Sequence, residues 1–328
     1  MAVLGGYLCV TGLPKRRATG VIVLASALVA LSLLTAFRWF YFGEVTPNTY
    51  TLKVTGAALD ERLQRGLSVL FSPSMLLHFV LILAVLAVSV PGLRSLPRAR
   101  LVAMSLPLAA FLVQAAYSAY VGGDVWEDLG YPNRFIVIVM PCLLALVLVC
   151  LRGTVSRFLP AGGADGQSGA RIPRAAFLAL AGLIVVNTSA GSAFAALRGA
   201  PAYVAIDRAA TEAGLCLRRH TPTDARIAVV WAGSMPYYAD RFAIDLLGKM
   251  DREIAATVPK AKFLPGHNKW DYAYSIATYK PDFVLQVWGN RPGDIDLIRA
   301  HGYVPVDPAW PCFANGFLVP GQVFAKRN

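Results

Sequence analysis

Residues 21–40, VIVLASALVALSLLTAFRWF, form an apolar run that ends in aromatic residues around a single arginine, Arg38. A helix of about 20 apolar residues spans the hydrocarbon core of a bilayer, so this run predicts a membrane helix. The next stretch, YFGEVTPNTYTLKV at 41–54, is polar and contains Pro47. Because proline interrupts a helix, the sequence predicts that the chain leaves the membrane at this point.

The composition extends the membrane interpretation to much of the chain. Of the 328 residues, 56% are hydrophobic and 15% are charged, and the mean hydropathy is +0.53. Soluble domains are usually about 45–50% apolar and about 25% charged. Segments long enough to cross a bilayer recur along the chain and predict five membrane helices, at 19–40, 74–93, 101–121, 135–151 and 176–197.

The charges between these segments predict an orientation. Basic residues gather before the first span and after the second and fourth, whereas the alternate loops 41–73 and 122–134 carry most of the acidic side chains. Positive residues favour the cytoplasmic side, which places the N-terminus inside and the C-terminus outside. The net charge is +12, but the basic residues do not form a stripe with interleaved aromatic residues. This pattern argues against nucleic acid as a partner.

A change of composition near residue 198 divides the chain into two predicted domains. We expect residues 1–198 to form an α-helical polytopic membrane domain, in which the short apolar segment 1–14 is either an interfacial segment or the second half of a severed helix. Residues 199–328 alternate strand-like and helical stretches, which is typical of an α/β domain with a mostly parallel sheet. We therefore expect a multi-pass protein of the plasma membrane, with this α/β domain on the extracytoplasmic side.

The strands and helices of the α/β domain follow from short runs. We expect strands within 226–233, 242–248, 282–289, 303–306 and 315–320, and helices at 203–219 and between the strands. Two cysteines, Cys216 and Cys312, lie in this domain, where thiols can oxidise. A disulfide between them and two separate thiols are both compatible with the sequence, which does not give their separation.

The first candidate site surrounds the proline-containing stretch. Arg38 and Lys53 supply two cations at the predicted outer surface, near the hydrogen-bonding side chains of Asn48 and Thr49. Such a group could bind the phosphate of a lipid carrier. The structural alternative is an arginine that extends to the interface from an aromatic belt.

The second candidate site is a dense group of acids. Asp124, Glu127 and Asp128 fall within five residues, beside Trp126 and ahead of Arg134. Carboxylates can accept a proton from a hydroxyl, bind sugar hydroxyls or coordinate a divalent cation. The structural alternative is a solvated loop in which the acids balance Arg134.

The third candidate site lies in the α/β domain. Trp231, Tyr237 and Tyr238 follow a predicted strand, and Trp270 precedes a predicted helix. The turns after the strands of α/β folds bind ligands, and these aromatic rings could stack on a glycan. No glycine-rich dinucleotide motif accompanies them, so structural loops are the alternative.

Together these stretches resemble the second half of a GT-C-type glycosyltransferase of the actinobacterial arabinofuranosyltransferase group. The resemblance is carried by Arg38 with residues 41–44, Pro47-Asn48-Thr49, Lys53, Gly66-Leu67, Gly122-Gly123-Asp124, Arg134 and residues 232–255. It implies transfer of a sugar such as arabinofuranose from a polyprenyl-phosphate donor to a cell-envelope polysaccharide, at the surface of a lipid bilayer.

The resemblance also implies roles for the candidate residues. Arg38, Asn48, Thr49 and Lys53 would bind the donor, and Glu127, Asp128 and Arg134 would contact the acceptor or a divalent cation. Asp124 could substitute for the family's catalytic acid. The family's usual acid lies in a first outer loop that this sequence lacks. We therefore expect an enzyme truncated at its N-terminus, with a non-catalytic membrane-anchored glycan-binding or scaffolding protein as the alternative.

Overall fold

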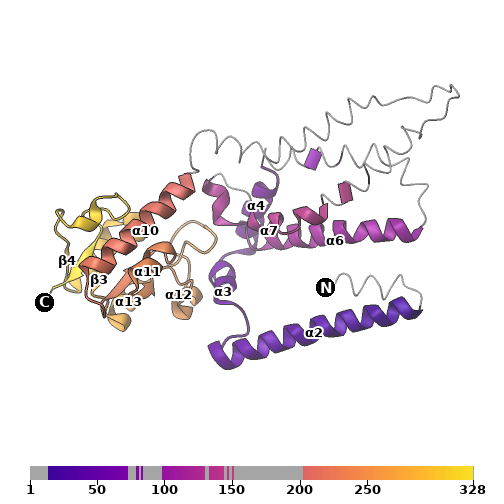
Figure 1. Cartoon of the computed structure of the whole chain (residues 1–328), viewed down its shortest axis with the longest axis horizontal. Helices are drawn as coiled ribbons and strands as arrows, with labels where there is room; N and C mark the ends of the chain where they lie inside the picture. The colour runs from indigo at the N-terminus through magenta and orange to yellow at the C-terminus, as the bar shows by residue number, and fades with distance from the viewer. Residues whose placement is uncertain are drawn as a thin grey trace, which may run out of the picture. The chain divides into compact units, whose positions relative to one another are not determined.

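The computed structural model describes residues 14–72, 98–129, 133–143 and 202–327, with isolated positions at 79–80, 83, 146–147 and 150. The chain forms two compact units (Figure 1). Unit 1 comprises Met1–Pro47 and Ala58–Gly191, and unit 2 comprises Asn48–Ala57 and Ser192–Asn328. The chain therefore contributes a short segment, 48–57, to unit 2 before it returns to unit 1.

Unit 1 is helical in its described part. Its elements are α2 (Pro14–Phe42), α4 (Leu59–Leu70), α6 (Arg98–Tyr120), the 3-10 helix η1 (Val125–Leu129) and α7 (Arg134–Val137). Helices α4 and α6 meet at Gly66, where a Cβ atom would lie 2.4 Å from the carbonyl oxygen of Ala119. Only glycine permits this approach, which brings α4 against the end of α6.

The prediction of five membrane helices is wrong for the residues that the structure describes. They contain one helix long and apolar enough to cross a membrane, Arg17–Phe42, with a hydropathy of 2.4. The predicted span 101–121 coincides with α6. Apolar residues of this helix pack against protein, because Phe111 and Ala119 are buried in a core with Leu70 and Ile136.

The other predicted spans give no support to the five-helix topology. Residues 135–151 begin as the four-residue helix α7 and turn at 138–139. The spans 74–93 and 176–197 lie outside the described residues, apart from positions 79–80 and 83. The predicted orientation depended on all five spans, so the described residues give it no support.

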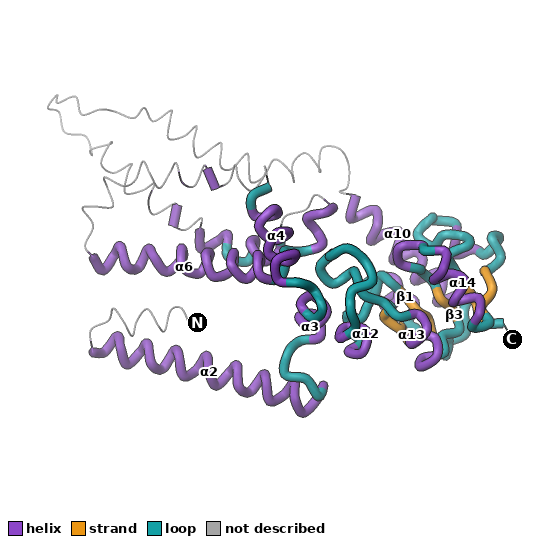
Figure 2. Tube along the Cα trace, turned by 180° about the vertical axis from the view of Figure 1, so that it is seen from behind, coloured by secondary structure: helices purple, strands orange, loops and turns teal. Residues whose placement is uncertain are grey.

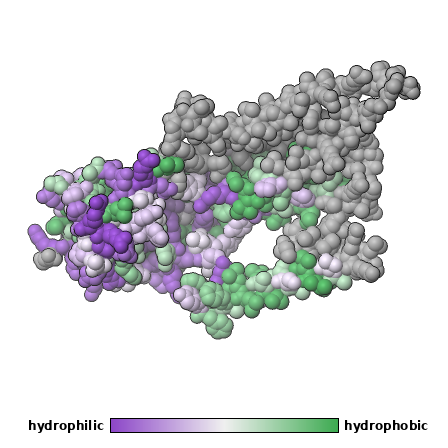
Figure 3. Space-filling view, viewed as in Figure 1, coloured by the Kyte–Doolittle hydropathy of each residue, from purple (hydrophilic) through white to green (hydrophobic). Residues whose placement is uncertain are grey.

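Helix α2 is the apolar element of unit 1. Only 6% of its most apolar window is buried, and Figure 3 shows a largely hydrophobic surface along it. Exposed aromatic rings gather at its end, where Phe40 is 86% exposed. A single apolar helix near the N-terminus is typical both of a membrane anchor and of a signal sequence.

Unit 2 contains a five-stranded sheet in the order β2-β1-β3-β5-β4. The strands are β1 (Arg226–Val229), β2 (Phe242–Asp245), β3 (Phe283–Val284), β4 (Tyr303–Pro305) and β5 (Phe324–Lys326). Strand β1 pairs in parallel with β2 and β3, whereas β5 pairs antiparallel with β3 and β4. The sheet is therefore mixed, and the prediction of a mostly parallel sheet is wrong.

The reason lies in the last strand. The predicted fifth strand at 315–320 forms turns instead, and β5 lies further along the chain. No α-helix separates β4 from β5, because the intervening segment holds only the 3-10 helix η3 (Pro311–Phe313). A parallel return needs a crossover, usually a helix, so this connection brings the chain back antiparallel.

Helices cover both faces of the sheet (Figures 1 and 2). Alternate residues of β1 point to opposite faces, as the pleat requires. Ile227 and Val229 pack with α10 (Ala202–His220) and α11 (Ser234–Ala239), whereas Ala228 packs with α13 (Tyr272–Tyr279) and α14 (Pro292–Ala300). The remaining helices of unit 2 are α3 (Asn48–Val54), α12 (Arg252–Ala256) and the 3-10 helix η2 (Trp288–Asn290).

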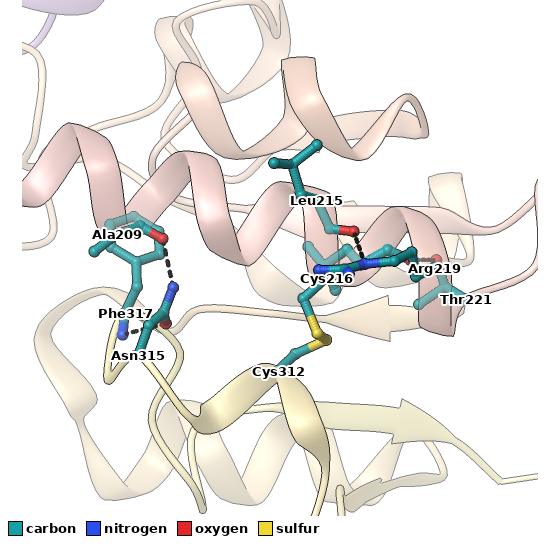
Figure 4. The surroundings of a disulfide bond; sticks show 9 residues. Ala209, Leu215, Cys216, Arg219, Thr221, Cys312, Asn315 and Phe317 are labelled. Atoms are coloured by element: carbon teal, nitrogen blue, oxygen red, sulfur yellow. Dashed lines mark hydrogen bonds between the residues drawn. A yellow bond between two sulfur atoms is a disulfide. The ribbon is translucent and has the colours of Figure 1, made fainter.

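A disulfide joins the first helix of this sheet domain to its last connection. Cys216 of α10 bonds Cys312 of η3, with Cα atoms 5.5 Å apart and a sequence separation of 96 (Figure 4). Asn315 adds a hydrogen bond of 2.7 Å from its side-chain amide to the carbonyl oxygen of Ala209. The cross-link thus fixes the segment between β4 and β5 onto α10.

Removing the disulfide should destabilise unit 2. A loop of this length predicts that the Cys216→Ser, Cys312→Ser variant loses about 2–5 kcal/mol of unfolding free energy, because the unfolded chain gains conformational freedom. Urea titration followed by tryptophan fluorescence measures the loss. Cys142→Ser is the matched control, since that thiol is exposed and not part of a disulfide. Equal stability of the double variant and the wild type would contradict the assignment.

Candidate functional site

The acidic loop of unit 1 is held by a cation that comes from another helix. Arg65 of α4 donates hydrogen bonds to the carbonyl oxygens of Gly122 and Asp124, the second over 2.9 Å. Its guanidinium also pairs with Glu127 at 3.3 Å and with Asp128 at 3.0 Å. Arg65 therefore fixes both the backbone and the acids of this loop.

Two glycines give the loop its shape. Gly122 and Gly123 have φ angles of 83° and 76°, a region that other residues avoid. A Cβ atom at Gly123 would lie 2.8 Å from Glu127 Oε2. The pair turns the chain sharply after α6 and lets the Glu127 carboxylate lie against the backbone.

Asp124 is an anchor of the loop. Its side chain is 1% exposed and forms an ion pair with Arg134, whose Nη2 lies 2.9 Å from Asp124 Oδ1. The same oxygen accepts a hydrogen bond of 2.9 Å from the backbone N–H of Val125. Because both oxygens are engaged, this geometry does not favour Asp124 as the catalytic base that was predicted.

Glu127 has the properties expected of a proton acceptor. Its side chain is 9% exposed, and Oε2 accepts a hydrogen bond of 2.9 Å from the backbone N–H of Asp124. The other oxygen, Oε1, is buried without a hydrogen-bond partner. Burial raises the pKa of Glu127 from 4.5 to about 7, against the opposing effects of the Asp124 N–H and Arg65. A carboxylate that titrates near neutral pH suits general acid–base catalysis.

The surroundings of Glu127 are partly open. Asp128 has a side chain that is 50% exposed, and Arg134 is 62% exposed with its guanidinium 5.4 Å from the centre of the Trp126 ring. Among the described residues, no group of three or more His, Cys, Asp or Glu side chains could hold a metal ion. Arg65 and Arg134 pair with the carboxylates of this cluster.

The residues of the first candidate site are divided between the two units. Asn48, Thr49 and Lys53 belong to unit 2, whereas Arg38 belongs to unit 1. The side-chain amide of Asn48 donates to the carbonyl oxygens of Gly248 at 2.8 Å and Lys249 at 3.1 Å. These bonds attach α3 to the turn after β2 and give Asn48 a structural task, while its contact with the donor stays a prediction.

The rest of segment 48–57 is also packed onto unit 2. Leu52 is only 2% exposed, and a Cβ atom at Gly56 would lie 3.0 Å from Pro259. The side chain of Lys53 lies beside Gly266, with Cγ 3.8 Å from the position of a Cβ atom there. Thr49 faces outward and is exposed.

Three of the four aromatic candidates lie on the surface of unit 2. Tyr237 is 80% exposed, Trp231 42% and Tyr238 40%. Trp270 is 1% exposed and belongs to the core, where its indole N–H donates to Asp294 over 3.2 Å. The stacking role predicted for Trp270 is therefore wrong, because the residue lies inside the domain, ahead of α13.

Sequence reasoning missed two residues that organise these regions. Arg65 lies in the predicted loop 41–73 without a motif of its own, although its neighbour Gly66 marks a close helix contact. Gln286 is a polar residue inside the apolar run 282–289, and its Oε1 accepts hydrogen bonds from the N–H groups of Val230 and Trp231. A polar side chain within a buried strand is the signal that could have identified it.

Comparison with known proteins adds one match. Residues 201–317 match a family described as Domain of unknown function (DUF8728), which covers most of unit 2 and none of unit 1's described residues. No curated protein and no solved structure matches the chain. The match supports residues 201–317 as a recurring domain and leaves its activity open.

Replacing Asn48 tests the attachment of α3. The Asn48→Ala variant loses both hydrogen bonds to the turn after β2, so we expect a loss of about 1–2 kcal/mol in local stability. Hydrogen exchange of residues 48–57 and 248–256 should become faster. Thr49→Ala removes an exposed neighbour and should leave exchange unchanged. Equal acceleration in both variants would contradict the structural role of Asn48.

The raised pKa of Glu127 predicts a specific pH dependence of stability. Between pH 4.5 and about 7 the folded state binds more protons at Glu127 than the unfolded state, so this contribution to stability is lost as the pH rises through that window. The stability of the wild type relative to Glu127→Gln should fall by roughly 1–3 kcal/mol from pH 4 to pH 8. Urea titrations at both pH values measure the difference, and a difference independent of pH would refute the prediction.

Proposed function

We propose that the protein acts in sugar transfer from a polyprenyl-phosphate donor to a hydroxyl of a cell-envelope glycan. The observation that carries this proposal is the buried Glu127 carboxylate, which has one oxygen without a hydrogen-bond partner and a pKa of about 7. Glu127 takes the place that sequence analysis gave to Asp124. The sugar that the resemblance suggests is arabinofuranose.

The reaction needs a proton acceptor and a stabilised leaving group. Glu127 accepts the proton of the attacking hydroxyl, the hydroxyl oxygen forms a bond to the anomeric carbon, and the bond from that carbon to the phosphate oxygen breaks. The electron pair leaves with the polyprenyl phosphate. We assign the stabilisation of that charge to Arg134, a cation of the same loop region whose side chain is 62% exposed.

Two features support a location at a membrane surface. Only 6% of the most apolar window of helix α2 is buried, and a bilayer would cover its exposed surface. The disulfide of unit 2 is typical of an oxidising compartment, outside the cytoplasm. We propose a membrane anchor formed by α2, with unit 2 on the extracytoplasmic side.

A non-catalytic role is the second candidate. Arg65 lies among the carboxylates and pairs with both Glu127 and Asp128, as in a structural ion-pair network. A scaffolding or glycan-binding protein needs no proton acceptor, so transfer activity separates the two proposals.

A transfer assay with the full chain in membranes tests the enzyme. With radiolabelled polyprenyl-phosphate arabinose and an arabino-oligosaccharide acceptor, Glu127→Gln should reduce the rate by about 10²–10³-fold, because the amide cannot take up the proton. Asp60→Asn is the matched control, since it removes an exposed carboxylate of α4 and should keep the wild-type rate. An unchanged rate in Glu127→Gln, or no transfer by the wild type, would reject the catalytic proposal.

A further inference from the structure

The topology of unit 2 marks one edge of its sheet. Strand β1 lies between β2 and β3, and all three are parallel. Helix α11, which links β1 to β2, packs on one face with α10, whereas α13, which precedes β3, packs on the other. The chain thus changes direction between β1 and β3, and α/β folds bind ligands beyond the carboxyl ends of strands at such a switch point.

A glutamine side chain spans this switch point. Gln286 follows β3, and its Oε1 accepts hydrogen bonds of 3.1 Å and 3.0 Å from the N–H groups of Val230 and Trp231, which follow β1. The carboxamide is therefore fixed in orientation by two backbone donors. Its Nε2 group has no partner among the described residues of unit 2, so two N–H donors remain available at a defined position.

Two more side chains are tied to the turn after β1, namely Trp231, whose backbone N–H bonds Gln286, and Asp207, which accepts a hydrogen bond from Ser234. Trp231 is 42% exposed, although it follows a strand whose residues are buried. Asp207 of α10 accepts a hydrogen bond of 3.2 Å from the hydroxyl of Ser234 through Oδ1, and Oδ2 has no partner among the described residues. Between Trp231 and Ser234, a Cβ atom at Gly233 would meet no heavy atom within 4 Å, so the surface is open there.

We propose that this edge is a sugar-binding subsite, with a sugar ring packed on Trp231 and its hydroxyls bonded to Gln286 and Asp207. An aromatic face beside a fixed amide donor and a carboxylate acceptor suits a neutral polyhydroxyl compound. A carboxylate disfavours a phosphate, and the turn after β1 lacks the glycine-rich sequence of a dinucleotide site. The choice of a glycan ring as the ligand rests on the proposed function.

Binding of acceptor-like probes to the full chain, without any donor, tests the subsite. The probes are an arabino-oligosaccharide and a galacto-oligosaccharide, titrated by calorimetry. Trp231→Ala should weaken binding of the preferred probe by about 10-fold or more, because the stacking surface is lost. Gln286→Glu keeps the acceptor for Val230 and Trp231 but removes the N–H donors, and it should weaken binding by about 3–10-fold.

The controls separate this subsite from general surface binding. Phe242→Ala removes an aromatic side chain that is 59% exposed. Phe242 begins β2, whereas the proposed subsite lies beyond the carboxyl ends of the strands, so affinity should change by less than about 2-fold. Asp60→Asn should bind the probes as the wild type does. Because probe binding is measured without a donor, loss of binding in Trp231→Ala is distinguishable from a failure of the transfer reaction. Two results would overturn the proposal. One is equal weakening of binding by Trp231→Ala and Phe242→Ala, and the other is no binding of either probe at a concentration of about 10 mM.

Discussion

The candidate site depends on the hydrogen bonds and ion pairs that the guanidinium of Arg65 forms with the loop after α6. It reaches from α4 to four acceptors in the loop after α6, two of them carbonyl oxygens and two of them carboxylates. The approach of the two helices at Gly66 makes this reach available, since a larger residue would collide with Ala119. A packing constraint in the helical unit thus sets the position of an ionisable group.

The chemistry of Glu127 follows from the balance of opposing effects on its carboxylate. Burial disfavours the charged form, whereas Arg65 and the N–H of Asp124 favour it, and burial is the larger effect. Asp124 lies in the same loop but is paired with Arg134 and bonded to the backbone. Two neighbouring acids therefore have different tasks, one as an anchor and one as a group that titrates near neutral pH.

Local patterns predicted much of the architecture, and long-range contacts account for what they missed. The runs at 226–233, 242–248, 282–289 and 303–306 contain β1 to β4, and the acid-rich loop was identified as a candidate site. Apolar composition did not distinguish a membrane span from a packed helix such as α6, whose Phe111 is buried by protein. Nor could local sequence show that Asn48 bonds carbonyl groups 200 residues away, or that Trp270 lies in the core.

The buried position of Glu127 predicts that its carboxyl group exchanges a proton near neutral pH. The most direct test is an infrared titration of the full chain, in which the carboxylate band of the wild type minus that of Glu127→Gln isolates this one group. The structure predicts a single transition centred near pH 7. A transition near pH 4.5, the ordinary value for a glutamate, would show a solvated carboxylate and would contradict the account.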